Sequence, residues 1–198
     1  MDRVASVVGE VEQTTLGELV PMVVARSGRY RSASWRIAVS FSWAITAVAG
    51  CVFPEWTSDK ILFMQLPLIW LGWQVAKFSP LLRRIVTRVE SGYETHRHAV
   101  EAFYHHHLHR TTEQTGVLLF ISRFERRVVI LADEGIHAKV KDGTWEQVVQ
   151  GMLPLVREDR LADALEYGAK ACGKVLSEHF PSSGKKANQL SNRPIIED

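Results

Sequence analysis

Two adjacent acidic residues, Asp133 and Glu134, follow an apolar run of the chain, and His137 stands three residues further on. Carboxylates at the end of a strand suit calcium or another divalent cation, because these ions prefer oxygen ligands. Arg126 and Arg127 precede the same run, and arginines bind phosphate through paired N–H groups. These five residues are the candidate ligand-binding set, and a metal-dependent phosphatase or other hydrolase is one function that they would serve.

Histidines form the second group with chemical potential, since six of the eight in the chain lie between residues 96 and 109. On a helix, His98, His105 and His109 would share one face, with His105 and His109 four residues apart. Imidazoles at this spacing suit a transition metal or a pH-sensitive patch. The alternative is a solvated polar face, because no cysteine or carboxylate accompanies them at ligand spacing.

Each candidate also has a purely structural interpretation. Asp133 could accept backbone N–H groups in the loop after a strand, and Gly135 could supply a positive φ angle. Arg126 and Arg127 could be ordinary turn charges beside Glu125. The choice therefore depends on the elements that position these residues.

Two unbroken apolar runs, Val117–Ile121 and Val128–Ala132, flank a short charged turn and lead directly to the acids. Continuous β-branched and apolar runs of this length indicate strands that are covered on both faces. Their short connection predicts an antiparallel hairpin at the centre of a sheet, with helices above and below. Leu19–Val24 predicts another strand, at an edge or with a bulge, because Pro21 has no N–H to donate.

Helical spacing predicts four helices around these strands. The first contains Val4, Val8 and Val11, and a long one runs from about residue 82 to 110 with an apolar stripe. Thr144-Trp145-Glu146-Gln147 predicts a capping box that starts the third helix, and the fourth spans about 159–179. Residues 182–198 contain too little apolar surface to order and are expected to form a disordered tail. The stripe of the long helix comprises Val89, Tyr93, Val100, Phe103 and Tyr104.

Residues 36–78 predict a transmembrane helical hairpin. The runs Ile37–Phe53 and Ile61–Ala76 approach the roughly 17 to 25 residues that a helix needs to cross a bilayer. Arginine and lysine gather outside the hairpin and the turn contains only Lys60, so the positive-inside rule places both termini in the cytoplasm. Two buried core helices of a soluble protein are the alternative, although a domain this small could not bury them on all sides. The net charge of +2 does not indicate nucleic acid as a partner.

The segments TLGELVPMVV and TGVLLFISRFERRVVILADEGI, the hairpin between them and the closing HFP together resemble the TPM domain family. This family includes plant thylakoid-lumen acid-phosphatase-like proteins and bacterial membrane proteins. The chain is most similar to the bacterial subgroup that carries a transmembrane hairpin inside the domain, and the resemblance covers about residues 5 to 181. It implies an α/β fold, a small mixed sheet sandwiched by helices, in which residues 1–30 and 80–181 form one domain around the inserted hairpin.

The resemblance also bears on function. Some relatives are described as acid phosphatases, some bind calcium, and others are accessory subunits of membrane complexes. The acidic cluster that opens many family members is absent here, which argues against calcium binding and phosphatase chemistry. From the anchored topology and the lack of a nucleophile–base pair, we expect a non-enzymatic accessory factor in the assembly, quality control or repair of membrane proteins. Its partners would be the lipid bilayer and other proteins of the bacterial inner membrane. A metal-dependent phosphatase and a calcium- or pH-responsive module are the alternatives.

Overall fold

The computed structural model describes residues 1–77, 79–111, 114–141, 143–182 and 190–197. The chain divides into two compact units. Residues 1–28 and 92–198 form the first, which we call the α/β unit, and residues 29–91 form the second, the hairpin unit. The second unit is therefore inserted, in sequence, within the first.

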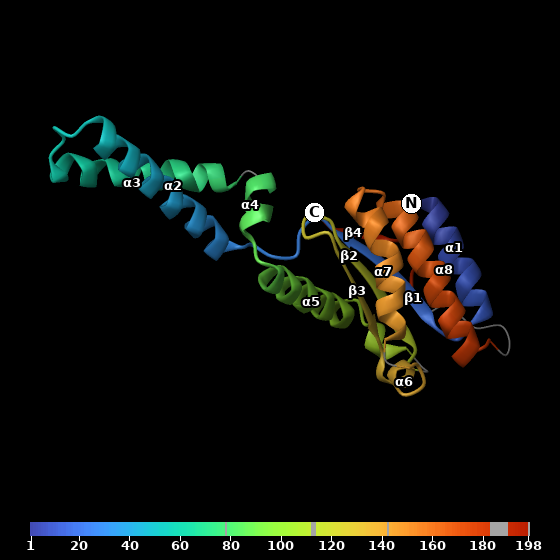
Figure 1. Ribbon diagram of the computed structural model, residues 1–198. Coiled ribbons are helices and arrows are strands. Elements are labelled where there is room, and N and C mark those ends of the chain that lie inside the picture. The colour runs from blue at the N-terminus through green and yellow to red at the C-terminus, as the bar shows by residue number, and fades with distance from the viewer. Residues whose placement is uncertain (78, 112–113, 142, 183–189, 198) are drawn as a thin grey trace. The chain divides into compact units, whose positions relative to one another are not determined.

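The α/β unit is built on a four-stranded mixed sheet in the order β3-β2-β1-β4 (Figure 1). β2 pairs with β3 in antiparallel fashion, as the two apolar runs predict, and β1 is parallel to both β2 and β4. The mixed sheet expected from the sequence is therefore confirmed. The strands are β1 (Glu18–Val24), β2 (Gly116–Ser122), β3 (Arg127–Ala132) and β4 (Ile195–Glu197).

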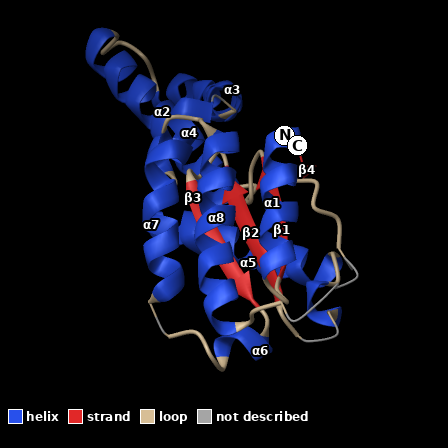
Figure 2. Ribbon diagram, turned by 90° about the vertical axis from the view of Figure 1, so that its right-hand side faces the viewer, coloured by secondary structure: helices blue, strands red, loops and turns tan. Residues whose placement is uncertain are grey.

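Helices cover both faces of this sheet (Figure 2). One face packs against α1 (Asp2–Thr14), α7 (Thr144–Arg157) and α8 (Leu161–His179) through a core that includes Leu19 and Leu119. The other face packs against α5 (Arg88–His105) and the 3-10 helix η1 (Leu108–Arg110). Successive strand residues point to opposite faces, so β1 and β2 are buried on both faces and, apart from Glu18 and Ser122, carry no polar side chains.

The N-terminal segment completes the sheet across the inserted hairpin unit. β1 pairs with β2 from Glu18↔Gly116 to Val24↔Ser122, and all seven β1 residues are buried. The expected edge position of β1 is wrong, because β4 pairs with its last three residues, Met22–Val24. Pro21 lies before the residues of β1 that pair with β4. Its missing N–H is therefore compatible with an interior strand.

The long helix expected over residues 82–110 is broken twice. α4 (Ser79–Ile85) ends before Thr87, and α5 begins after it. Thr87 Oγ1 accepts the Glu90 N–H at 3.1 Å, and a Glu90 carboxylate oxygen accepts the Thr87 N–H at 3.0 Å. This is a capping box, which starts a new helix. The second break follows His105, where His107 adopts a left-handed φ of 57°.

Two further expectations are corrected. Thr144 does not cap α7, because Gly143 occupies the N-cap position at φ 85° and the Thr144 hydroxyl donates instead to the Lys141 carbonyl at 2.8 Å. At the C-terminus, Ile195–Glu197 form β4 rather than the disordered tail that composition predicts. Residues 183–189 and 198 of that predicted tail lie outside the described residues.

The hairpin unit consists of α2 (Arg31–Val52) and α3 (Ser58–Ala76), joined by residues 53–57, with α4 after them. The helices approach closely at Gly72, where an added Cβ would lie 2.8 Å from the Ala38 Cα. The rings of Trp35 and Trp73 meet edge-on, with their centroids 5.1 Å apart. Small residues at the contact allow this close packing, so the helical hairpin expected over 36–78 is present as a structural element.

Glu90 makes the hairpin unit sensitive to acid. Arg36 donates to both of its carboxylate oxygens, at 3.0 and 2.9 Å, and together with Thr87 it lowers the pKa of Glu90 to about 2. A carboxyl group whose pKa is lower in the folded state stabilises that state above its unfolded pKa, near 4.5, and this contribution is lost as pH falls towards about 2. We expect the urea midpoint of the wild type to exceed that of Glu90→Gln at neutral pH, with the difference shrinking progressively below pH 4.5. A difference that stays constant in acid would contradict this assignment.

Candidate functional site

Asp133 lies where β3 ends and caps the short helix α6 (Glu134–His137). Its Oδ1 accepts the Glu134 N–H at 2.9 Å, and its own N–H donates to the Gly116 carbonyl at 2.9 Å. Within the described residues, the buried Oδ2 has no hydrogen-bond partner. Glu134 and His137 are exposed, and Gly135 is helical rather than in the positive-φ conformation expected of it.

A pocket of about 370 Å³ opens at the same end of the sheet. Lys139 and His179 supply its charged or titratable groups, and the Lys139 Nζ lies 4.5 Å from the centre of the Phe180 ring. Thr115 is held by a hydrogen bond from its hydroxyl to the Leu16 carbonyl at 2.9 Å. The combination of apolar walls with a cation suits an organic anion more than a bare metal ion. The lining residues are Leu16, Thr115, Gly135, Lys139, His179, Phe180 and Pro181.

This pocket was not found from the sequence, because its walls come from distant segments. The Thr15–Pro181 bridge joins the start of β1 to the end of α8, and the Thr15 hydroxyl donates to the Phe180 carbonyl at 2.8 Å. The closing HFP segment was the available signal, but it was interpreted as part of the family resemblance and not as a pocket wall. Of the candidate acids, neither Asp133 nor Glu134 lines the pocket, although Gly135 beside them does.

Arg126 and Arg127 lie at the opposite end of β3 from Asp133. A strand of this length separates its ends by roughly 20 Å at about 3.3 Å per residue. A phosphate held by Arg126 would therefore be remote from a cation held by Asp133. The five candidate ligand-binding residues do not form one site.

The turn that contains Arg126 has a structural role. A Glu125 carboxylate oxygen accepts the N–H groups of Ser27 and Gly28, at 3.1 and 3.3 Å, and the other accepts the Ser122 hydroxyl. Arg126 itself adopts a φ of 53° at the end of the turn. These bonds fix the chain as it leaves β1, so Glu125 has a structural role in this turn.

The three candidate histidines are not brought together. His98 faces the sheet, where its ring meets Phe120 edge-on at 5.4 Å, whereas His105 is exposed. His109 lies in η1 beside Tyr104, beyond the end of α5, so helical spacing does not continue to it. Among the residues that the structure describes, no group of three or more His, Cys, Asp or Glu side chains is arranged to hold a metal ion.

A different pair of histidines meets an acid at the sheet edge. The Nε2 atoms of His98 and His106 lie 3.6 and 3.8 Å from the Glu197 carboxylate of β4. Burial lowers the pKa of His106, and the neighbouring His105 lowers it further, while Glu197 acts in the opposite direction. Sequence patterns missed this contact because Glu197 lies in the segment expected to be disordered.

Two substitutions at Asp133 test whether its side chain stabilises the fold by capping α6. We expect Asp133→Ala to lower the free energy of unfolding by about 1 kcal/mol, because Glu134 loses its N-cap acceptor. Asp133→Asn keeps a side-chain oxygen at the cap and should lie close to the wild type. Urea denaturation of both variants measures the difference. Equal stability of the alanine variant and the wild type would contradict the capping role.

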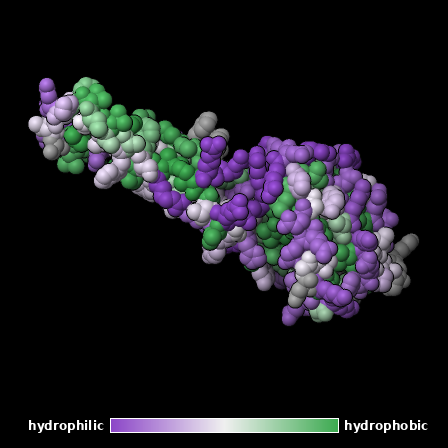
Figure 3. Space-filling view, viewed as in Figure 1, coloured by the Kyte–Doolittle hydropathy of each residue, from purple (hydrophilic) through white to green (hydrophobic). Residues whose placement is uncertain are grey.

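The hairpin unit presents an apolar surface. In Figure 3 its visible face is largely hydrophobic, whereas that of the α/β unit is largely hydrophilic. Phe63 is 75% exposed, Leu66 71% and Trp43 67%. Monomeric soluble proteins rarely expose apolar surface of this extent, which marks contact with a membrane or a protein.

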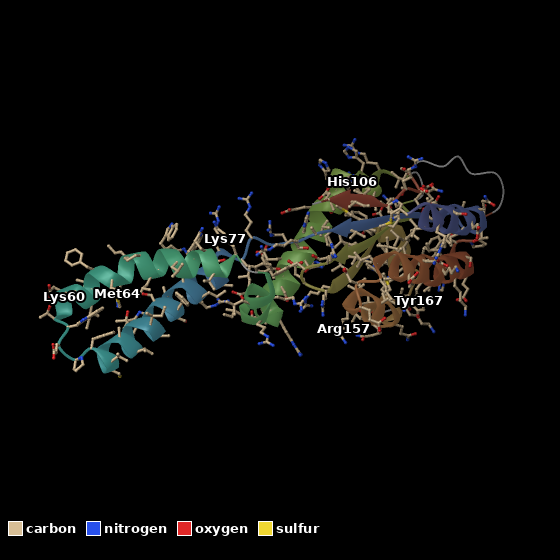
Figure 4. All side chains as sticks on the ribbon, turned by 90° about the horizontal axis from the view of Figure 1, so that it is seen from above. Lys60, Met64, Lys77, His106, Arg157 and Tyr167 are labelled. Atoms are coloured by element: carbon tan, nitrogen blue, oxygen red, sulfur yellow. The ribbon has the colours of Figure 1, made fainter. Side chains whose placement is uncertain are left out.

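Measured by length and composition, one helix among the described residues could cross a membrane, namely α2, near the N-terminus. Only 17% of its apolar window is buried, whereas a core helix of a soluble protein is mostly buried. α3 does not meet the same measure, because Asp59, Lys60, Gln65 and Gln74 lower its hydropathy. Lys60 lies at the turn end of α3 and Lys77 at its other end (Figure 4).

Comparison with known proteins identifies part of the chain. Residues 83–175 match the family model described as TPM domain. Residues 83–175 therefore belong to a TPM domain. The matched segment includes β2, β3 and α7, whereas α1 and β1 precede it. The sheet described above therefore contains one strand, β1, that lies N-terminal to the matched segment.

A solved structure shares the fold. The NMR structure of the BA42 protein from the psychrophilic bacterium Bizionia argentinensis superposes with a TM-score of 0.61 at 14% sequence identity. The alignment covers 98% of this chain and 90% of BA42. Among curated proteins, no sequence matches the chain.

Proposed function

We propose that this protein is a TPM domain anchored in the bacterial inner membrane by two spans, α2 and α3. In this proposal it acts as a non-enzymatic accessory factor in the assembly, quality control or repair of other membrane proteins. The observation that carries the anchor is the apolar surface of the hairpin unit, where Trp43, Phe63 and Leu66 are each more than 65% exposed. Lipid would cover these side chains.

The composition of α3 is compatible with a second span. Its polar Asp59 and Lys60 lie in the first turn, close to water. Gln65 and Pro67 lie deeper, and a neighbouring helix can satisfy polar groups at that depth. The Ser42 hydroxyl of α2 donates to the main-chain carbonyl of Gln65 at 3.5 Å, so α2 supplies a polar group at this depth.

Cysteine labelling tests the two-span topology. In a Cys51→Ala background the remaining Cys172 is fully buried, and burial raises its thiol pKa to about 12, so it should not react. We expect an impermeant maleimide to label Glu55→Cys in intact cells, and to label Asp2→Cys and Glu146→Cys only after permeabilisation. Labelling of Glu146→Cys but not Glu55→Cys in intact cells would reverse the orientation. If Asp2→Cys and Glu146→Cys were labelled from opposite sides of the membrane, the chain would cross it once and not twice.

The accessory role is supported by the way in which the domain is joined to its anchor. One connection leaves the sheet after β1, which ends at Val24, and the other returns to β2 through α5, which packs on the sheet. The pocket with Lys139 and His179 lies at the other end of β1, near Leu16. We infer that this pocket receives an anionic or polar segment of a partner protein.

A photo-crosslinking residue tests that role in native membranes. We expect a crosslinker at Lys139, on the pocket rim, to form a discrete adduct with an integral membrane protein. A crosslinker at Lys174, which is exposed on α8 outside the pocket lining, is the matched control. The adduct at Lys139 should be lost when Phe180→Ala opens the pocket wall. Equal yields of the adduct at Lys139 and Lys174 would contradict the assignment of the pocket as the partner-binding site.

A metal-dependent phosphatase or hydrolase is the second candidate function. The observation that favours it is the buried Oδ2 of Asp133, which lacks a partner within the described residues. Phosphate release should then depend on added divalent cation and should fall in the double variant Asp133→Ala/Glu134→Ala. Equal release by the wild type and this variant would eliminate the hydrolase.

A further inference from the structure

We propose that the base of the hairpin unit binds the headgroups of anionic phospholipids. This inference rests on the proposed membrane anchor and adds a lipid class to it. The binding surface consists of four exposed basic residues, which we call the basic collar: Arg31, Lys77, Arg83 and Arg84. Arg31 begins α2, Lys77 caps α3, and the two adjacent arginines belong to α4.

The collar is positioned by the packing of α4 against the other two helices. Leu82 of α4 is only 3% exposed, so one side of this short helix is buried within the unit. Arg36 of α2 donates to the Ile85 carbonyl at the end of α4, at 3.3 Å. α4 is thereby held at the base of the hairpin, while Arg83 and Arg84 remain exposed.

The charges of the collar are not compensated within the unit. The acidic residues of the hairpin unit are Glu55 and Asp59, which lie in or beside the turn, and Glu90. Glu90 is already occupied by Arg36, at 2.9 Å. No collar side chain forms an ion pair with any residue that the structure describes, so the four positive charges are free to attract an external anion.

The neighbouring surface identifies that anion as a lipid headgroup. Trp35 and Trp73 pack edge-on near the same ends of α2 and α3 as the collar. Trp35 is 52% exposed, and tryptophan is enriched at the level of the headgroups in membrane proteins. Beyond it along the hairpin lie apolar residues such as Val39 and Trp70, which are also exposed. A surface that passes from basic through aromatic to apolar matches a phospholipid from its phosphate to its acyl chains.

Lipid retention by the full-length protein tests this inference. The protein is reconstituted in nanodiscs of phosphatidylcholine mixed with phosphatidylglycerol, and the lipid that stays bound after detergent extraction is quantified by native mass spectrometry. We expect retained phosphatidylglycerol to exceed its share in the mixture. Each basic residue near a membrane surface contributes roughly a fivefold preference for anionic lipid. The variant Arg83→Gln/Arg84→Gln should therefore lose the preference by roughly 10- to 25-fold.

Two control variants make the result specific. Arg83→Lys/Arg84→Lys keeps the charges and should retain most of the preference, and Lys60→Gln removes a basic residue at the turn end and should leave it unchanged. Equal retention of both lipids by the wild type, or an unchanged preference in the glutamine variant, would overturn the headgroup site while leaving the anchor intact. Failure of the wild type to enter nanodiscs of either composition would overturn the anchor and the headgroup site together.

Discussion

Deletion of residues 1–25 should leave the rest of the chain unable to form the α/β unit. The deletion removes α1 and also removes β1 from between β2 and β4, and β1 alone contributes five buried apolar side chains to the sheet core. Burial of such side chains contributes roughly 1.5–3 kcal/mol each, so the loss is about 10 kcal/mol, comparable with the roughly 5–15 kcal/mol that stabilises a whole domain. Loss of a cooperative urea transition, with Trp145 fluorescence as the probe in a variant that lacks the other tryptophans, measures this result.

Removal of the hairpin is the matched control for that deletion. Residues 29–87 are replaced by a Gly/Ser linker of about 15 residues, whose ends are typically about 20 Å apart. This variant keeps both pieces of the sheet, and we expect a soluble protein with a cooperative transition. A folded remainder after loss of residues 1–25, or an unfolded chain after replacement of the hairpin, would contradict the two-piece sheet.

The strands β2 and β3 were predictable because their signal is local. Val117–Ile121 and Val128–Ala132 are continuous apolar runs around a turn, and a central antiparallel pair is the arrangement that buries both faces. The helix α7 was predictable for the same reason, with Val148, Met152 and Val156 buried at helical spacing. The role of Asp133 as an acceptor of a backbone N–H also followed from its place at the end of a strand.

The face of α5 was mispredicted because small residues, rather than large ones, pack on the sheet. The expected stripe included Val89 and Tyr93, which are 81% and 67% exposed. Phe103 of that stripe is buried as predicted, but the other buried positions are Thr95, Ala99 and Ala102. Small side chains let a helix lie close to a sheet, but they contribute little to an apolar pattern.

The candidate site was only partly predictable because its contacts join distant segments. β4 contains three residues, and its place is decided by the free edge of β1 at Met22–Val24 rather than by its own composition. The pocket brings Leu16, Lys139 and Phe180 together, and no spacing in the sequence relates them. The sequence places a strand between Arg126 and Asp133, but their grouping in one ligand-binding set did not take its length into account.

Gly116→Ala should be the most destabilising single methyl addition in the α/β unit that we consider. An added Cβ would overlap the Leu108 carbonyl oxygen and lie 3.1 Å from the Leu108 carbonyl carbon. Leu108 is fully buried, so η1 could move away from β2 only by opening the core. We expect a loss of about 3 kcal/mol in the free energy of unfolding, at the upper end of the cost of overpacking.

Gly92→Ala is the matched substitution, because the same methyl there makes only ordinary contacts, 3.6 Å from the Arg127 guanidinium. Gly92 lies within α5, and alanine in a helix interior is more stable than glycine by up to about 1 kcal/mol. The two variants should therefore move the urea midpoint in opposite directions. The contrast depends on the turn after His105, which brings the Leu108 carbonyl over the start of β2. A single helix to residue 110 would not place this carbonyl there, so equal midpoints for the two variants would argue that the chain does not turn where the structure breaks the helix.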